Sequence, residues 1–468
     1  MKIVIVGAGM VGSQLARHLI QERDDVVIVE RDEEVARHAS NRLDCLVLHD
    51  EGNSLAVLEE AGIAKADALI CVTESDEVNM ITCGLAASRY PELLKIARVR
   101  NDEYAKLSGM DERLLGIDRF VHPDVEAARA VLAAIEHGAL GDVLAFGDGP
   151  FELGSVDVGA GSSLADVSVR DFRSLVGGEC LVTLVERGDE TIIPDGSTTL
   201  RVGDRFHALA REDELGRIFE LAGRRMKSLQ RIGIVGGSRI GALIVEGLLG
   251  NDEKKPSMLS RLMRVFRPKA YRKVVVIERD YGLCKELSAR FPEALVLNED
   301  ISDEGFVADE GIGDLDLIVT ATENQELNMI AALYLKSRGV DRAVALVSGA
   351  GYAAIARRLG VDVVVPMKSV VVDSILSHLL GRGVRGVHRV GDGSVEILEM
   401  ELCDTAPVIG TRLDQFKLAA GGLVMLVTRG TESFLPHGDY VFAAGDKIVL
   451  TVKKGGEDEA ERLFGTRS

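Results

Sequence analysis

The chain has 468 residues, a length that suggests three or four domains. Apolar residues make up 46% and charged residues 28%, which excludes a disordered chain, and the absence of tryptophan points to aliphatic cores. The net charge of −19 argues against bulk nucleic-acid binding. The sequence has no apolar run of about 18 residues and no signal-peptide layout at MKIVIVGAGMVG, so we expect no membrane span and no export. The six cysteines are dispersed without a CxxC pair, which favours a reducing cytosol over a disulfide or zinc framework.

In chain order, the first predicted elements are short apolar runs separated by helical stretches. The predicted strands are KIVIV, DVVIV, CLVLH, ALICV and KIARV, and helices are expected at residues 12–21 and 33–43. Continuous Val/Ile/Leu runs are typical of strands buried on both faces of a parallel sheet. The alternation predicts a doubly wound, Rossmann-like α/β domain.

The next segment has a different pattern, with short strands such as CLVTLVERG and RFHALAR around a Pro-x-Gly turn. This pattern predicts a small α+β module after the Rossmann-like domain.

The whole arrangement then recurs in the second half of the chain. The offset is 229 residues at the first glycine motif and 248 at the next strand end, so an insertion of 19 residues lies between them. The repeated pairs are Val4–Gly12 with Gly233–Gly241, Ile28–Asp32 with Val276–Asp280, Leu46–Leu48 with Leu295–Leu297, Thr73 and Asn79 with Thr322 and Asn328, and Pro194, Gly196, Gly203 and Asp204 with Pro436, Gly438, Gly445 and Asp446. We therefore predict four domains: 1–138 and 227–383, Rossmann-like, and 139–226 and 384–468, α+β.

A dinucleotide fingerprint opens the first half. Gly7-x-Gly9-x-x-Gly12 follows the first strand and begins a helix, and Glu30 ends the next strand. The glycines would allow a tight turn, close approach to a pyrophosphate and helix packing, while the helix N-terminus attracts phosphate. Glu30 would bond the adenosine ribose and repel a 2′-phosphate, which favours NAD(H), although Arg31 beside it weakens that preference.

Further candidates follow the later strands of the same sheet. Glu51 follows the third strand and would meet the adenine amino group, with a solvated acidic turn as the equal alternative. Thr73 and Glu74 end the fourth strand and should face the crevice at the carboxyl edge of the sheet. Arg98 in the fifth strand would neutralise a phosphate, and Arg100 lies two residues further on, with a surface salt bridge as the alternative for either arginine.

The second half keeps only part of this set. Ser238 replaces the middle glycine, and its Cβ would crowd a pyrophosphate. Leu346 and Ser348 replace the two arginines, so the charge complementarity to phosphate is lost. Glu278, Asp300, Thr322 and Glu323 remain, and the loop positions of the second half are Gly236, Gly237, Arg239 and Ile240. We expect tight nucleotide binding in the first half and weak or altered binding in the second.

Motifs for catalysis are missing from the sequence. It contains no GxSxG, HExxH or P-loop lysine motif, and its nine histidines are dispersed. His122 lies near a strand end beside Asp124, but a structural role is the more economical interpretation. We predict neither catalytic residues nor a metal site, and an NAD-dependent oxidoreductase stands as the competing hypothesis.

Taken together, these motifs resemble the TrkA family of regulatory subunits of Trk-type potassium uptake systems. The matching stretches include KIVIVGAGMVG, AGIAKADALICVTESDEVNM, KIARVR, RIGIVGGSRIG, IPDGSTTLRVGD and LPHGDYVFAAGD, and they cover two tandem RCK units. The resemblance implies nucleotide contacts at Gly7, Ala8, Gly9, Met10, Val11, Glu30, Thr73, Glu74 and Arg98, and in the second half at Gly236, Gly237, Ser238, Arg239, Ile240, Glu278, Thr322 and Glu323. Asp50 and Glu299 depart from the family's glycine after the third strand.

The resemblance also implies a function and partners. It implies a non-enzymatic gating protein at the cytoplasmic face of the membrane that binds NAD(H), with ATP and ADP as further candidates. It implies a homo-oligomeric ring, expected to be a tetramer, beneath a Trk-type potassium channel subunit. A dinucleotide sensor for another cation channel is the remaining alternative.

The insertion in the second half is the main departure from the family. Residues 254–273 hold eight Lys/Arg and no acid, and Met258, Leu259, Leu262, Met263 and Phe266 recur at helical spacing. A basic helix with an apolar stripe suggests contact with anionic lipid or with the channel. An equally good interpretation is a solvated basic segment whose apolar stripe packs on its own domain.

Overall fold

The structure, a computed structural model, describes the chain apart from residues 22–23, 102, 105–113, 137, 140–142, 147–149, 189, 224–228, 251–272, 304, 380–383, 391–394, 416–417, 419–420, 454 and 465–468. The chain forms two compact units, and each combines segments from both halves. The N-terminal unit contains Met1–Glu136 and Leu229–Leu379, and the C-terminal unit contains His137–Ser228 and Leu380–Ser468. Within the described part of the chain, every helix is too short or too polar to cross a bilayer.

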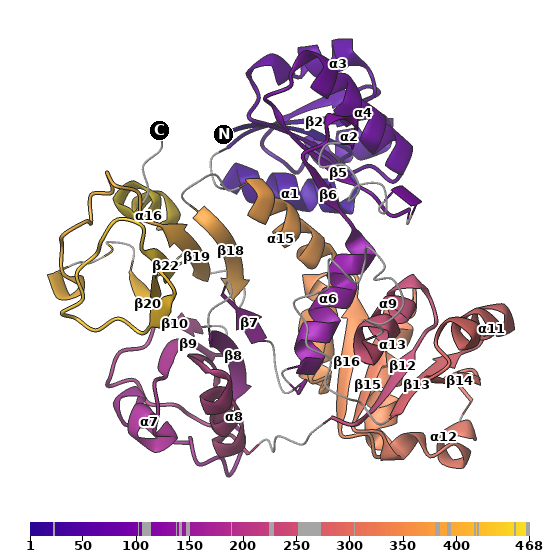
Figure 1. The fold of residues 1–468 in the computed structure, drawn as a ribbon, viewed down its shortest axis with the longest axis vertical. Helices are drawn as coiled ribbons and strands as arrows, with labels where there is room; N and C mark the ends of the chain where they lie inside the picture. The colour runs from indigo at the N-terminus through magenta and orange to yellow at the C-terminus, as the bar shows by residue number, and fades with distance from the viewer. Residues whose placement is uncertain are drawn as a thin grey trace. The chain divides into compact units, whose positions relative to one another are not determined.

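The first half of the N-terminal unit is built on a six-stranded sheet, drawn in indigo to purple in Figure 1. Its strand order is β3-β2-β1-β4-β5-β6. All neighbouring strands run parallel. The central strands are apolar because both of their faces are covered, and all four residues of β4 are buried. The strands are β1 Lys2–Val6, β2 Asp25–Glu30, β3 Leu46–His49, β4 Ala68–Cys71, β5 Leu94–Arg98 and β6 Arg119–Val121.

Helices alternate with these strands, and side chains cap their first turns. The Asp32 carboxylate accepts from Val35 N–H at 2.9 Å before α2, and the Ser75 hydroxyl accepts from Val78 N–H at 3.2 Å before α4. The helices are α1 Met10–Gln21, α2 Glu33–Ser40, α3 Leu55–Glu60, α4 Asp76–Arg89 and α6 Pro123–Glu136, with short 3-10 turns η1 Ile63–Lys65 and η2 Leu114–Gly116.

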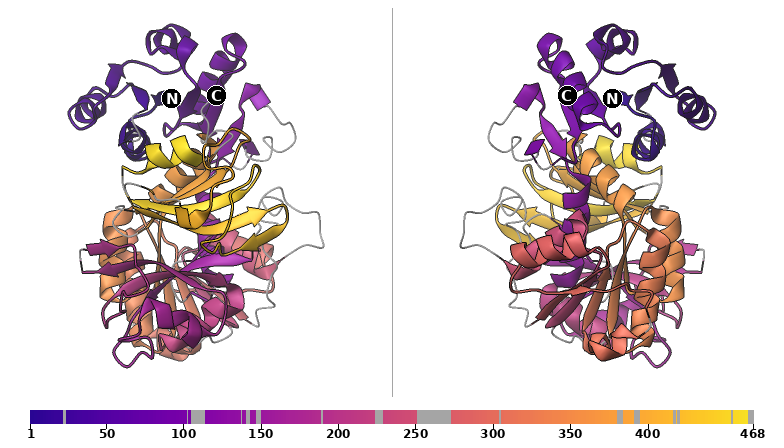
Figure 2. Two further views of the ribbon diagram at one scale, coloured as in Figure 1. Left: turned by 90° about the vertical axis from the view of Figure 1, so that its left-hand side faces the viewer. Right: turned by 90° about the vertical axis from the view of Figure 1, so that its right-hand side faces the viewer.

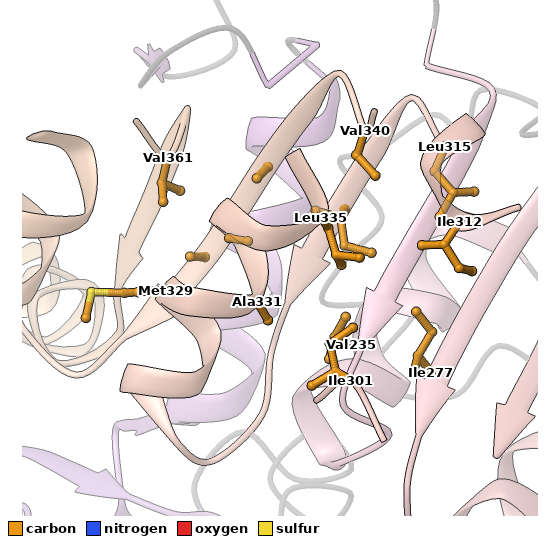
Figure 3. Packing of buried hydrophobic residues seen from close by; sticks show 14 of the residues in the cluster. Val235, Ile277, Ile301, Ile312, Leu315, Met329, Ala331, Leu335, Val340 and Val361 are labelled. Carbon is orange, nitrogen blue, oxygen red and sulfur yellow. The ribbon is translucent and has the colours of Figure 1, made fainter. Parts of the chain in front are cut away.

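The second half repeats this parallel sheet in the order β14-β13-β12-β15-β16-β17. Figure 3 shows its core, a buried cluster to which Leu335 and Val340 belong together with Val235 and Ile277 of the sheet. The strands are β12 Arg231–Val235, β13 Lys273–Glu278, β14 Leu295–Asn298, β15 Leu317–Thr320, β16 Arg342–Val347 and β17 Val363–Pro366. The helices are α9 Arg239–Leu249, α11 Tyr281–Arg290, α12 Phe306–Asp309, η3 Ile312–Asp314, α13 Gln325–Ser337, α14 Ala350–Leu359 and α15 Met367–Leu379.

The last helix of each Rossmann-like domain, α6 or α15, packs on the other Rossmann-like domain. Ile375 and Leu376 of α15 belong to the core of the first sheet, together with Ile5 and Leu15. In return, α6 packs against α9 and β17 of the second half, and Figure 1 shows α6 beside α9. The approach of α6 and α9 is so close that a Cβ on Gly247 would lie 2.3 Å from Leu132 Cδ1. The two Rossmann-like domains therefore form one unit with interlocked cores.

The C-terminal unit consists of two five-stranded antiparallel sheets, with the orders β10-β9-β11-β8-β7 and β18-β19-β22-β20-β21. The sheets lie face to face (Figure 2, left view, magenta and yellow), with Phe151 and Leu209 of one meeting Met425 and Val449 of the other. The strands are β7 Val143–Ala145, β8 Phe151–Asp157, β9 Leu181–Arg187, β10 Glu190–Ile192, β11 Arg205–Arg211, β18 Val384–Val390, β19 Val395–Glu401, β20 Gly422–Arg429, β21 Glu432–Phe434 and β22 Lys447–Lys453. The outer face of the first sheet carries α7 Val169–Val176 and α8 Glu212–Leu221. The outer face of the second carries η4 Leu413–Gln415 and α16 Glu457–Phe464.

This architecture confirms the predicted fold class of two Rossmann-like domains, each followed by a small α+β domain. The expected strands lie within one residue of their observed bounds, whereas β6 and β17, which close the two parallel sheets, were not among the strands expected. All six cysteines are free thiols. The predicted basic insertion, residues 254–273, lies outside the described residues except for Lys273, which begins β13.

Candidate functional site

The glycine motif forms a tight loop between β1 and α1. Gly7 has φ +105°, and a Cβ there would lie 3.0 Å from Thr73 N. A Cβ on Gly12 would lie 1.9 Å from the Gly7 carbonyl oxygen, so α1 packs directly on the turn. A Cβ on Gly9 would meet no described residue within 4 Å, so the described part of the chain leaves open space beside the loop. Since α1 begins at Met10, its first N–H groups lie at this space and lack acceptors within the helix.

Glu30 ties this loop to the end of β2. Its Oε2 accepts from Ala8 N–H at 2.6 Å, and its Oε1 accepts from Asp32 N–H at 2.9 Å. The carboxylate therefore lies beside the glycine loop, where the fingerprint requires an acid. Both oxygens hold backbone groups here, and each has a second lone pair that a ribose hydroxyl can address.

A buried asparagine organises the end of β4, and sequence analysis assigned it no role. Asn79 Oδ1 accepts from Thr73 N–H at 2.9 Å and from the Thr73 hydroxyl at 2.7 Å. Its Nδ2 donates to the carbonyl oxygens of Thr73 at 3.1 Å and Arg98 at 2.8 Å. One side chain thus sets the relative positions of two predicted site residues. The signal was available, because Asn79 recurs as Asn328 at the same spacing from the threonine.

Arg98 is a half-buried cation at the carboxyl edge of the first parallel sheet. Its Nη1 donates to the Thr73 carbonyl at 3.1 Å, and its buried Nε has no hydrogen-bond partner among the described residues. Burial, and then the nearby Arg100 charge, lower the pKa of Arg98, although Asp76, Asp124 and Glu74 oppose this. An anion at the edge would compensate this desolvated guanidinium.

The other predicted residues lie on the exposed rim of the site. Met10, Arg31, Glu51 and Glu74 are exposed. The Arg31 carbonyl contacts His49 Nε2 at 3.1 Å, which joins the ends of β2 and β3. The structure therefore brings the glycine loop, Glu30, Thr73 and Arg98 to one carboxyl edge of the sheet, and leaves these rim side chains around it.

The second half reproduces the frame of the site. Gly236 has φ +103°, and a Cβ on Gly241 would lie 2.0 Å from the Gly236 carbonyl oxygen. Gly237 N–H donates to Glu278 Oε2 at 2.6 Å. Asn328 accepts from Thr322 N–H at 2.9 Å, as Asn79 does from Thr73. The frame is therefore duplicated residue by residue.

The chemistry at the rim of the second site differs. The Ser238 hydroxyl donates to the Ala321 carbonyl at 3.2 Å and occupies space that is open beside Gly9. Ser348, at the position of Arg100, donates its N–H to Gln325 Oε1 at 3.0 Å. Asp300 and Glu323 are exposed, and hydrogen bonds from Ser302 lower the pKa of Asp300.

The two halves meet in charged contacts near these loops. Asp124, in the first turn of α6, lies 3.5 Å from Arg239 Nε and 4.0 Å from Arg100 Nη2. Arg239 directly follows Ser238, so a carboxylate of the first half faces the phosphate-type loop of the second. His122 is buried with Nδ1 3.0 Å from the Val99 carbonyl, which agrees with a structural role.

Two parallel-sheet domains with this glycine loop, each followed by a small α+β domain, define a protein with two tandem Rossmann-type units. Two family models match accordingly: the TrkA-N domain at residues 3–123 and 256–366, and the TrkA-C domain at residues 153–223 and 397–465. The chain belongs to the TrkA family, which is non-enzymatic. The oxidoreductase hypothesis is therefore set aside.

Full-length relatives support this assignment. The chain is 29% identical over 468 residues to the Trk system potassium uptake protein TrkA of Azorhizobium caulinodans, covering 99% of this chain and 98% of the relative. It is 28% identical over 470 residues to TrkA of Halomonas elongata, covering 99% and 98%.

Solved structures share the fold. The GsuK channel bound to NAD matches with a TM-score of 0.55 and 17% identity, covering 99% of this chain and 78% of that one. The crystal structure of the GsuK RCK domain matches with a TM-score of 0.54 and 18% identity, covering 99% and 94%.

Proposed function

We propose that this chain is the nucleotide-sensing regulatory subunit of a Trk-type potassium uptake system. It binds NAD(H) in its first TrkA-N domain, with ATP and ADP as competing ligands, and transmits occupancy to a membrane channel subunit. The observation that carries this proposal is the edge at which the open Gly9 loop, Glu30, Thr73 and Arg98 meet. Relatives named Trk system potassium uptake protein TrkA supply the transport context.

The ligand class follows from the chemistry of that edge. The α1 N-terminus and Arg98 offer positive charge to a diphosphate, and Glu30 offers an acceptor to a ribose. A structure of similar fold is described as bound to NAD, which agrees with this class. We propose the ligand contacts Gly7–Gly12, Glu30, Arg31, Glu51, Thr73, Glu74 and Arg98.

The second TrkA-N domain is proposed to bind nucleotide weakly. Ser238 reduces the space beside its loop, and the arginine positions are occupied by Leu346 and Ser348. In addition, Asp124 already neutralises Arg239 and would repel a phosphate there. The equivalent contacts Gly236–Ile240, Glu278, Asp300, Thr322 and Glu323 would serve a ligand of lower charge.

Transmission requires that occupancy changes the packing between domains. A ligand shifts a conformational equilibrium only by its differential affinity for the two states. Because α6 and α15 each pack on the opposite domain, a movement of one nucleotide loop would change the packing of the other Rossmann-like domain. We propose that several copies, four in the expected ring, act together at the cytoplasmic face of the membrane, with residues 254–273 contacting anionic lipid or the channel.

Calorimetric titration of the full chain with NAD⁺, NADH, ATP and ADP tests the binding step. Gly9→Asp places a carboxylate in the open space beside the first loop and should abolish binding, because the carboxylate repels a phosphate. The fold should be kept, because no described residue lies within 4 Å of a Cβ at this position. Ser238→Asp is the matched control in the second loop and should leave the first site intact. Absence of binding by the wild-type chain, or undiminished binding by Gly9→Asp, would overturn the proposal.

A further inference from the structure

The first nucleotide loop is in contact with a lysine from the other half of the chain. Lys368 lies in the first turn of α15, directly after β17 ends at Pro366. Its Nζ is 2.7 Å from Met10 Sδ, and Met10 follows Gly9 in the glycine loop. A second contact, from Gln14 Nε2 to Ser369 Oγ at 3.4 Å, joins the same turn of α15 to α1.

This lysine has no charge partner among the described residues. A thioether is only a weak acceptor, so Met10 does not compensate an ammonium group. No described carboxylate forms an ion pair with Lys368, and burial alone lowers its pKa. An anion that binds at this loop would stabilise the ammonium group, because the group is partly desolvated and has no charged partner there.

The corresponding position in the other half carries the opposite charge. Asp124 occupies the second position of α6, as Lys368 occupies the second position of α15. Asp124 meets Arg239, which follows Ser238, just as Lys368 meets Met10, which follows Gly9. The crossing helices therefore bring a cation to the first loop and an anion to the second.

We infer that Lys368 is a phosphate ligand of the first nucleotide site, contributed by the second half of the chain. The inference rests on the proposed function, because it assigns a further residue to that same site. The ammonium would leave the Met10 sulfur and pair with a phosphate held at Gly9 and the α1 N-terminus. A bound nucleotide would then contact both Rossmann-like domains at once, which links its presence to the packing of α15 on the first sheet.

Titration of NADH and ADP into the full-length Lys368→Gln variant tests this assignment. We expect about a tenfold loss of affinity for both ligands, the size of one charge-assisted contact. Lys285→Gln, which alters an exposed lysine of α11 in the second half, is the matched control and should bind as the wild type does. Lys368→Arg should retain most of the affinity, because the charge is kept.

The salt dependence of binding separates a direct contact from an indirect one. If Lys368 pairs with phosphate, the affinity of Lys368→Gln should fall less steeply with added salt than that of the wild type. An unchanged affinity, or a loss with an unchanged salt dependence, would overturn the assignment. These outcomes differ from failure of the proposed function, in which the wild-type chain itself binds neither ligand.

Discussion

The buried asparagines of the two Rossmann-like domains allow a prediction with its own internal control. Asn79 and Asn328 are both almost fully buried, with 0% and 1% of their surface exposed, and both hold the threonine at the end of the fourth strand. Asn79→Ala removes four hydrogen bonds and leaves the Thr73 N–H and the Arg98 carbonyl without this partner, whereas the Thr73 carbonyl keeps its bond from Arg98 Nη1.

Two orphaned polar groups at about 1–3 kcal/mol each predict a destabilisation of about 2–6 kcal/mol. Asn328→Ala removes the equivalent bonds to Thr322 and Leu346, so we expect a similar loss. Urea unfolding followed by far-ultraviolet circular dichroism measures both losses, since the chain has no tryptophan.

The two variants should differ in nucleotide binding. Asn79→Ala releases Thr73 and Arg98 from their common support, so we expect about a tenfold weaker NADH affinity by calorimetry. Asn328→Ala should leave that affinity unchanged. Equal losses of affinity in the two variants, or stability losses below about 0.5 kcal/mol, would show that Asn79 does not support Thr73 and Arg98 in this way.

Three further predictions concern packing and charge. Gly12→Ala should lower the melting temperature and abolish NADH binding, because its Cβ would lie 1.9 Å from a carbonyl oxygen of the loop. Gly9→Ala should leave the melting temperature unchanged and only weaken NADH binding. Thermal melts and calorimetric titrations of the two variants in parallel check both expectations. Ile375→Ala, in a fully buried position of the crossing helix α15, should cost about 2–5 kcal/mol in urea unfolding, and a loss below about 1 kcal/mol would contradict its place in the first core. Burial alone would raise the pKa of Asp446, but hydrogen bonds led by that from Arg429 outweigh it and hold the pKa below the ordinary 3.8. The contribution of the Asp446 carboxylate to the free energy of unfolding is therefore complete above pH 3.8 and is lost as the pH falls through the lower, folded-state pKa. Asp446→Asn should therefore flatten the acid limb of a curve of stability against pH. An unchanged acid limb would contradict this expectation.

The parallel sheets could be predicted because buried strands of this kind are continuous apolar runs. Strands such as ALIC at Ala68–Cys71 stand out by composition alone, and the glycine motif marks the turn after β1. β6, at Arg119–Val121, was missed because it is short and lies at the edge of its sheet, where only one neighbour constrains it.

The contacts between the halves could not be predicted from local pattern. The helical period of α15 shows an apolar face, but nothing in it says that Ile375 packs in the first sheet instead of its own. Likewise, Lys368 and Met10 are 358 positions apart, and only the crossing of the helices brings them together. The role of Asn79 required knowledge of which carbonyls it reaches, although its repetition marked it as a candidate.

If nucleotide occupancy of the first domain controls a potassium pathway, as the claim under Proposed function states, NADH must alter potassium flux. The membrane subunit of a Trk-type system would be reconstituted in proteoliposomes with the wild-type chain or Gly9→Asp, with and without NADH. We expect NADH to change the flux with the wild-type chain and to have no effect with Gly9→Asp. A flux that NADH leaves unchanged, although calorimetry detects binding to the same wild-type chain, would contradict the claim.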